Sequence, residues 1–151
     1  MKRNFECLSL IVLLSLLVWC FPGAAQDIDT TDWVDIGGLR IPPAWSVSPV
    51  YDEDEGLNCV NITGEGANGS IRMFLGYGLS GPTEDLIEES LTSQEFIFDD
   101  KQSGYMLEFP ELIAWTRESR EKDVLLYHDG DRSVFTDNEE LILSVVRTLN
   151  Y

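Results

Sequence analysis

Short stretches in which apolar and polar residues alternate run through most of the chain after residue 32. Gly, Pro, Asn and Asp residues separate them, a combination typical of β-strands joined by tight turns. We predict a hairpin around Gly37-Gly38, three alternating strands, and a second run of strands between Glu95 and Thr136. The three alternating strands are Trp45–Tyr51, Leu57–Thr63 and Ser70–Tyr77, and the second run comprises Glu95–Phe98, Tyr105–Phe109, Leu112–Arg117, Val124–His128 and Arg132–Thr136.

Asp129-Gly130 is the strongest turn signal within the second run. It lies between the apolar stretches Val124–His128 and Arg132–Thr136. Because Asp-Gly favours the tight turns of two-residue hairpins, the sequence predicts that these stretches pair as strands.

Two segments show a helical pattern instead. Thr83 can cap a helix that begins with Glu84 and Asp85 and carries Leu86, Ile87 and Leu91 on one side. Asp137 and Glu140 have the spacing of a capping box, so we predict a second helix from this point. Its apolar stripe, which we expect to be buried, comprises Leu141, Ile142, Val145, Val146 and Leu149.

The predicted fold class is therefore α+β. We expect a mainly antiparallel sheet of about eight strands, joined by short turns, with two helices packed on it.

The first 25 residues have the order of a secretory signal. Lys2 and Arg3 precede an apolar run, Leu8 to Phe21, and small residues follow it. The run is shorter than the ~20 residues of a membrane-crossing helix, so we predict cleavage before Gln26 and a secreted or extracytoplasmic protein. Anchoring by an uncleaved helix is the alternative. Residues 26–32 are predicted to be a flexible acidic lead-in, and residues 33–151 a single globular domain.

Charge narrows the range of partners. Without the signal the chain has 26 acidic and 8 basic residues, a net charge of −18. Such a surface repels nucleic acids and anionic membranes, so we expect no nucleic-acid binding and no stable membrane insertion after cleavage. Cations, basic proteins and neutral ligands remain as candidate partners. The alternative explanation of the charge is that it only keeps an exported protein soluble. We expect the partner to be a protein or a small ligand, whose identity the charge does not specify.

Cys59 is the single cysteine left after cleavage, so no internal disulfide can form. We predict that it is a small buried hydrophobe, with intermolecular pairing or a reactive thiol as alternatives.

One glycine-rich motif and one acidic motif resemble known binding loops. Residues 76–81 match G-x-G-x-x-G, but Pro82 and Thr83 delay the helix and the preceding strand alternates, so we interpret the glycines as a connection and expect no cofactor. Residues 129–140 place oxygen-bearing side chains in a calcium-loop pattern, but Val134 stands where glycine must make the turn.

We assign no metal site. The candidates for low-affinity calcium binding are Asp52 and Asp54, in the acidic run 52–55, and Asp129 and Asp131.

No catalytic residue is assigned either. His128 is the only histidine; it borders the predicted hairpin turn, so we expect it to face solvent. No nucleophile motif accompanies it. Carboxylate pairs suited to hydrolysis are not identifiable among so many acids.

Two sequons, at Asn61 and Asn68, are candidate glycosylation sites. Asn68 lies in a predicted turn. Asn61 shares a strand face with Cys59, so we expect either burial of Cys59 under a helix or an accessible Asn61, but not both.

The stretch from Leu39 to Val47, a strand running into Pro42-Pro43 and then Trp45, resembles the PsbP-like fold group. The final hairpin and helix, ending in Val145-Val146-Arg147-Thr148-Leu149, are similar to it too. The resemblance implies an α/β/α sandwich and a binding role, typically without catalysis; no binding residue of the group can be matched here.

The sequence thus predicts an exported, non-catalytic interaction or ligand-binding module. A small extracellular hydrolase using carboxylates and a low-affinity calcium-binding protein are the alternatives.

Overall fold

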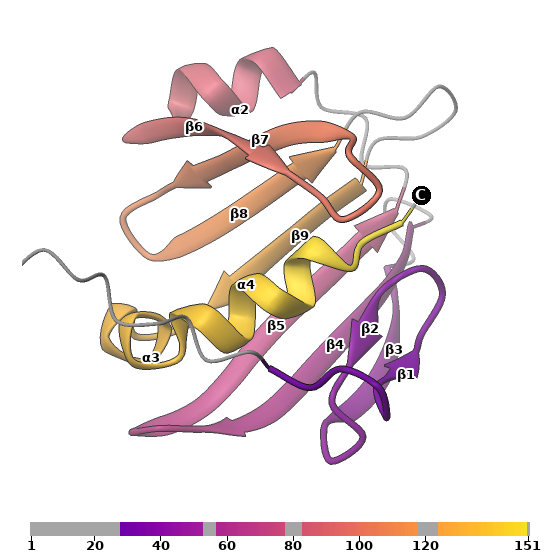
Figure 1. Cartoon of the computed structure of the whole chain (residues 1–151). Helices are drawn as coiled ribbons and strands as arrows, with labels where there is room; N and C mark the ends of the chain where they lie inside the picture. Colours follow the sequence, from indigo (N-terminus) through magenta and orange to yellow (C-terminus); the bar gives the residue numbers. More distant parts are fainter. Residues whose placement is uncertain (1–27, 53–56, 78–82, 118–123, 151) are drawn as a thin grey trace, which may run out of the picture.

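The computed structural model describes residues 28–52, 57–77, 83–117 and 124–150. These residues form one large sheet, a small hairpin and three short helices, which confirms the predicted α+β class (Figure 1).

The large sheet has seven strands, all antiparallel to their neighbours. In spatial order they are β3 (Ser46–Asp52), β4 (Leu57–Gly66), β5 (Gly69–Tyr77), β9 (Val124–Asp129), β8 (Leu112–Arg117), β7 (Ser103–Glu108) and β6 (Thr92–Ile97). The predicted strands from 45 to 77 form the β3–β4–β5 meander. The last strand, β9, joins this meander to the second one and so occupies the middle of the sheet (Figure 1).

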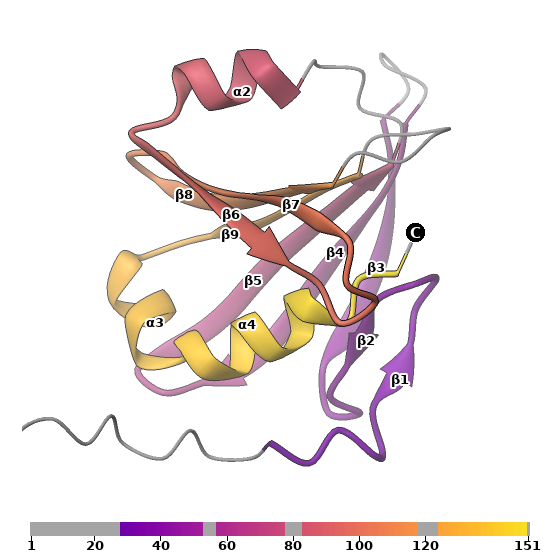
Figure 2. The same cartoon turned by 45° about the horizontal axis from the view of Figure 1, so that its top comes forward.

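The helices lie on opposite sides of the sheet, as Figure 2 shows. The sheet curves around α4 (Glu139–Arg147), with α3 (Arg132–Asp137) beside it, whereas α2 (Thr83–Glu89) lies on the other side above β6, β7 and β8. The hairpin of β1 (Val34–Asp35) and β2 (Arg40–Ile41) lies next to the end of α4.

The main core fills the space between the curved sheet and α4. The predicted stripe of α4 is buried there, with Ile142, Val145, Val146 and Leu149 sealed from solvent and Leu141 partly buried. Opposite it, Ile71, Met73 and Leu75 of β5 are buried while Arg72 faces out, as the alternation predicts. The large apolar face of α4 therefore holds the two meanders together.

The Gly37-Gly38 hairpin forms as predicted. Both glycines have positive φ, 92° and 94°, which explains why residues without a Cβ occupy the turn. The Asp35 Oδ1 atom accepts hydrogen bonds from the N–H groups of Gly37 and Gly38 at 2.8 and 3.0 Å. Both bonds lower the pKa of Asp35, and the bond from Gly38 has the larger effect.

The prediction of a strand at Arg132–Thr136 is wrong, because this segment is the helix α3. Asp129-Gly130 accordingly leads from a strand into a helix and makes no hairpin. Asp131 caps the helix by accepting a hydrogen bond from the Ser133 N–H at 2.9 Å. Val134 and Phe135 are both buried; a helix can turn two consecutive side chains toward one core, whereas a strand sends them to opposite faces.

The predicted capping box is also wrong. Asp137 ends α3, and Asn138 stands at the start of α4 without a side-chain cap bond. The Asn138 side chain is buried and accepts from the Ala67 N–H at 2.7 Å, while its Nδ2 donates to the carbonyls of Ala67 and Val134 at 3.0 and 2.7 Å. It therefore fastens the β4–β5 turn to the junction between the two helices.

The predicted helix at Thr83 is confirmed, but it is shorter than the apolar pattern implies. It ends at Glu89, and Leu91 lies beyond it with 65% of its surface exposed. Leu86 and Ile87 are partly buried.

Candidate functional site

His128 lies at the base of a small pocket, and the expectation that it faces solvent is wrong. It is only 2% exposed, because β9 is an interior strand with Met73 of β5 and Ile113 of β8 as cross-strand neighbours. The Phe135 ring of α3 packs on the same side, with ring centroids 5.9 Å apart. The helix that replaces the predicted strand is thus what buries the histidine.

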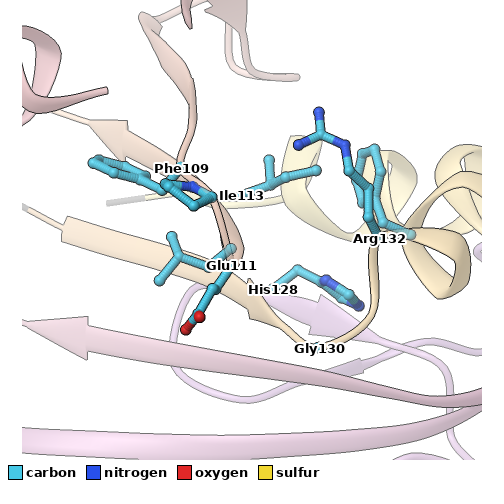
Figure 3. Close-up of a pocket in the computed structure, with 9 residues that line it drawn as sticks. Phe109, Glu111, Ile113, His128, Gly130 and Arg132 are labelled. Carbon is cyan, nitrogen blue, oxygen red and sulfur yellow. The ribbon is translucent and has the colours of Figure 1, made fainter. Parts of the chain in front are cut away.

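The pocket has a cavity volume of about 30 Å³. The turn between β7 and β8, the ends of β8 and β9, and α3 surround it (Figure 3). Its lining residues are Phe109, Pro110, Glu111, Leu112, Ile113, His128, Gly130, Arg132 and Phe135. In Figure 3 the imidazole of His128 and the charged ends of Glu111 and Arg132 point in different directions.

Burial disfavours the charged form of the imidazole. Desolvation lowers the pKa of His128 below its ordinary 6.5; the charge of Asp129 opposes this shift and that of Arg72 adds to it. Among the described residues, the lining includes no Ser, Thr or Cys side chain that His128 could activate as a nucleophile. The pocket can therefore offer a neutral hydrogen-bonding nitrogen in a mostly apolar setting.

A larger and more polar groove lies at the junction of α3 and α4. Its volume is about 450 Å³, within the ~300–1,000 Å³ typical of ligand sites. Its lining residues are Ile28, Thr136, Asp137, Asn138, Glu139, Glu140 and Leu141. Three of these carry carboxylates and none is basic, so the groove favours a cation.

Each described arginine forms a hydrogen bond, an ion pair or a ring contact with another group of the chain. Arg40 donates to the Thr30 carbonyl at 2.7 Å, and Arg132 pairs with Glu108 at 2.6 Å. Arg147 lies over the Phe96 ring, 5.8 Å from its centroid. The two remaining described arginines, Arg72 and Arg117, pair with Asp129 and Asp100.

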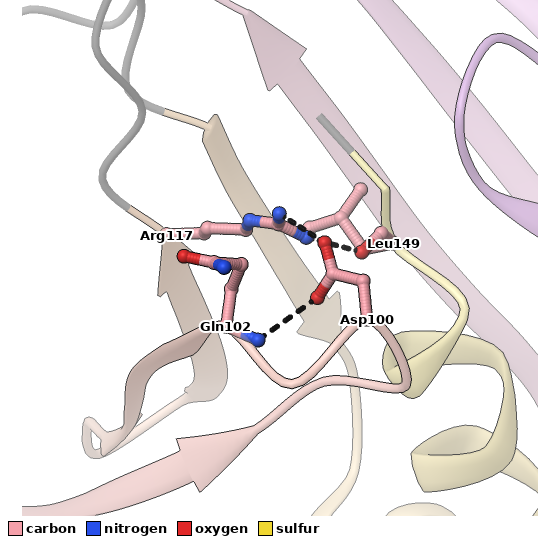
Figure 4. Close-up of polar contacts among 4 residues, drawn as sticks. All are labelled: Asp100, Gln102, Arg117 and Leu149. Atoms are coloured by element: carbon pink, nitrogen blue, oxygen red, sulfur yellow. Dashed lines mark hydrogen bonds and ion pairs between the residues drawn. The ribbon is translucent and has the colours of Figure 1, made fainter.

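No motif or spacing in the sequence marks Arg117. Its side chain is buried on the core side of β8, where it forms an ion pair with Asp100 and donates from Nη1 to the Leu149 carbonyl at 2.6 Å (Figure 4). Its guanidinium lies 5.3 Å from the centroid of the Phe98 ring. The role of this group is structural, because it ties the chain after α4 to the sheet.

The candidate metal ligands are dispersed in the structure. Asp129 Oδ2 lies 3.8 Å from Arg72 Nη2, and Asp131 caps α3, with the Ser133 N–H as the main cause of its lowered pKa. Asp52 ends β3, and Asp54 lies outside the described residues. Within the described ranges no three His, Cys, Asp or Glu side chains gather in a way that could hold a metal ion.

The G-x-G-x-x-G segment begins on an antiparallel strand. Gly76 pairs with Cys59 of β4 and Leu125 of β9, whereas a dinucleotide fingerprint follows a parallel strand. Residues 78–81 of the motif lie outside the described residues.

Cys59 is 5% exposed, which confirms its predicted burial. Asn61, two residues along the same strand face, is nevertheless exposed. The expectation that only one of these outcomes can hold is therefore wrong. The second sequon residue, Asn68, has a left-handed backbone, φ 61°, and donates from Nδ2 to Asp137 at 2.6 Å.

Comparisons of the chain with protein-family models, with curated proteins and with solved structures find no match. The PsbP-like resemblance therefore stays a prediction. The helices of the described ranges are all too short or too polar to cross a membrane.

Proposed function

We propose that this chain is an exported, non-catalytic binding module that recognises a positively charged partner. The observation that carries the proposal is the groove at the α3–α4 junction, where Asp137, Glu139 and Glu140 line the surface and none of the described lining residues is basic. A partner that inserts a lysine, arginine or other cation there gains Coulomb attraction from several carboxylates at once.

The interactions of the described arginines support this proposal. Each described arginine is bonded or stacked within its own fold, as given above, so the arginines do not neutralise the groove. The negative field of the surface also steers cationic partners toward it and raises their rate of association.

The carboxyl groups favour binding over acid catalysis. A carboxyl that acts as a general acid near neutral pH needs a raised pKa. The described carboxyls with a shifted pKa, Asp29, Asp35 and Asp131, shift downward because neighbouring Thr, Gly and Ser residues donate hydrogen bonds to them. A binding role also agrees with the PsbP-like resemblance and with the predicted secretory signal.

The test is a calorimetric titration of residues 26–151 with a decalysine peptide, carried out at low and at high salt. We compare the double variant Glu139→Gln/Glu140→Gln with Glu88→Gln/Glu89→Gln, an equal charge change on exposed positions of α2. We expect the α4 variant to weaken binding at least about fivefold and the α2 variant to change it less than about twofold, since surface charge contacts are each worth about 1 kcal/mol or less.

Equal loss in both variants would show that the peptide senses only the net charge, and the groove would be rejected as the site. A thermal melt with Ca²⁺ and with chelator tests the calcium alternative, because a bound ion raises the midpoint. An unchanged midpoint removes it.

A further inference from the structure

Three described side chains have a buried polar atom without a hydrogen-bond partner in the protein: Trp115 Nε1, Thr116 Oγ1 and His128 Nε2. Such atoms are rare in folded proteins because leaving one unpaired forfeits its hydrogen bonds to water. Of these three, His128 lines the small cavity described above. Its imidazole ring therefore borders a space that a partner from outside the chain can occupy.

The size of the cavity limits what that partner can be. A water molecule needs about 10–15 Å³ of such space, and an organic ligand needs several hundred. The cavity of about 30 Å³ thus accommodates one or two waters.

The lining is also suited to hydration. Purely apolar cavities stay dry, whereas polar ones hold water that bonds to two or more groups. Phe109, Ile113 and Phe135 form apolar walls, but the imidazole and the backbone of Gly130 are polar. At the mouth, the exposed Glu111 and Arg132 connect the cavity to solvent.

We propose that this cavity is a hydration site in which an ordered water is hydrogen bonded to His128 Nε2. The water satisfies the nitrogen that β9 and α3 bury, and it fixes the orientation of the imidazole ring. It is thus an integral part of the packing between α3 and the sheet, independent of what the acidic groove binds.

A side chain from the mouth is the competing partner. Arg132 is held by Glu108 at 2.6 Å, so Glu111 is the side chain that would have to turn inward to reach the imidazole. A direct bond from Glu111 would exclude the water and provides a clear alternative outcome.

Water-to-protein Overhauser spectroscopy on residues 26–151, which contain every described element, tests the proposal. We expect cross-peaks between a water that tumbles with the protein and two sets of protons, the ring protons of His128 and Phe135 and the methyl protons of Ile113. In His128→Phe, which keeps a ring against Phe135 but lacks the nitrogen, these signals should fall at least about fivefold. In Glu111→Ala they should persist.

A water signal absent from the wild type but present in Glu111→Ala would show that Glu111 is the partner and overturn the proposal. If His128→Phe does not fold, a high-resolution crystal structure of the wild type decides the matter. A dry cavity there also overturns the proposal, and a water within hydrogen-bond distance of Nε2 supports it.

Discussion

The guanidinium of Arg117 donates to the carbonyl oxygen of Leu149 at 2.6 Å, so a central strand of the sheet holds the chain that follows α4. The same guanidinium pairs with Asp100 in the turn between β6 and β7, whose carboxylate also accepts from the Gln102 N–H at 3.1 Å (Figure 4). One buried cation therefore connects three parts of the fold.

Asp100→Asn is expected to lower the free energy of unfolding by about 2 kcal/mol, because it leaves the buried Arg117 cation without its counter-charge. The neighbouring Asp99→Asn is the matched control, since the Asp99 side chain is exposed, and should cost less than about 0.5 kcal/mol. Urea denaturation of both variants measures the difference. Equal effects would show that the ion pair contributes no stability.

Asn138→Ala is expected to destabilise the fold by about 3 kcal/mol, because three hydrogen bonds at the α3–α4 junction are lost from a buried position. Asp137→Ala, which removes the residue that the sequence favours as the cap, should cost less than about 1 kcal/mol because its bond to Asn68 is exposed. The free energies of unfolding of the two variants are compared. The opposite order would support the capping box instead.

Gly104→Ala is expected to cost about 2 kcal/mol or more. A Cβ at this position would overlap the carbonyl oxygen of Thr116 on β8 and lie 2.9 Å from the Phe98 ring, and the strand backbone cannot move away freely. Ser103→Ala on the same strand is exposed and should change stability by less than about 0.5 kcal/mol. Thermal unfolding of both variants is the measurement, and a fully tolerated Gly104→Ala would contradict this close packing.

His128→Phe is expected to remove a pH dependence of stability below pH 6.5. Because burial lowers the pKa of His128 in the folded state, the unfolded chain binds the proton first as the pH falls. The wild type should therefore lose stability from about pH 6.5 down to the folded pKa, with no contribution from this group above pH 6.5. Unfolding free energies between pH 8 and 5 provide the test. A variant that keeps the wild-type slope would assign the dependence to other groups.

The first meander and the Gly37-Gly38 hairpin were predictable because each is local. Adjacent strands, period-two alternation and turn residues lie within one stretch of chain and need no distant partner. The stripe of α4 was equally predictable, since its i, i+4 spacing requires burial wherever the sheet lies.

The local signals of the segment 129–138 permit two structures. Asp-Gly favours a hairpin, yet Asp131 can cap a helix, and burial of both Val134 and Phe135 selects the helix. That choice also buries His128, which local spacing had placed at a solvent-facing turn.

The sequence by itself determined the class of fold, the hairpin, the strong negative charge and the burial of the last helix, because these depend on composition and short-range periodicity. The tertiary structure decided the rest. It placed β9 in the middle of the sheet and buried Arg117 and His128. These features depend on contacts between segments far apart in the chain, and such contacts leave no periodic trace in the residues that make them.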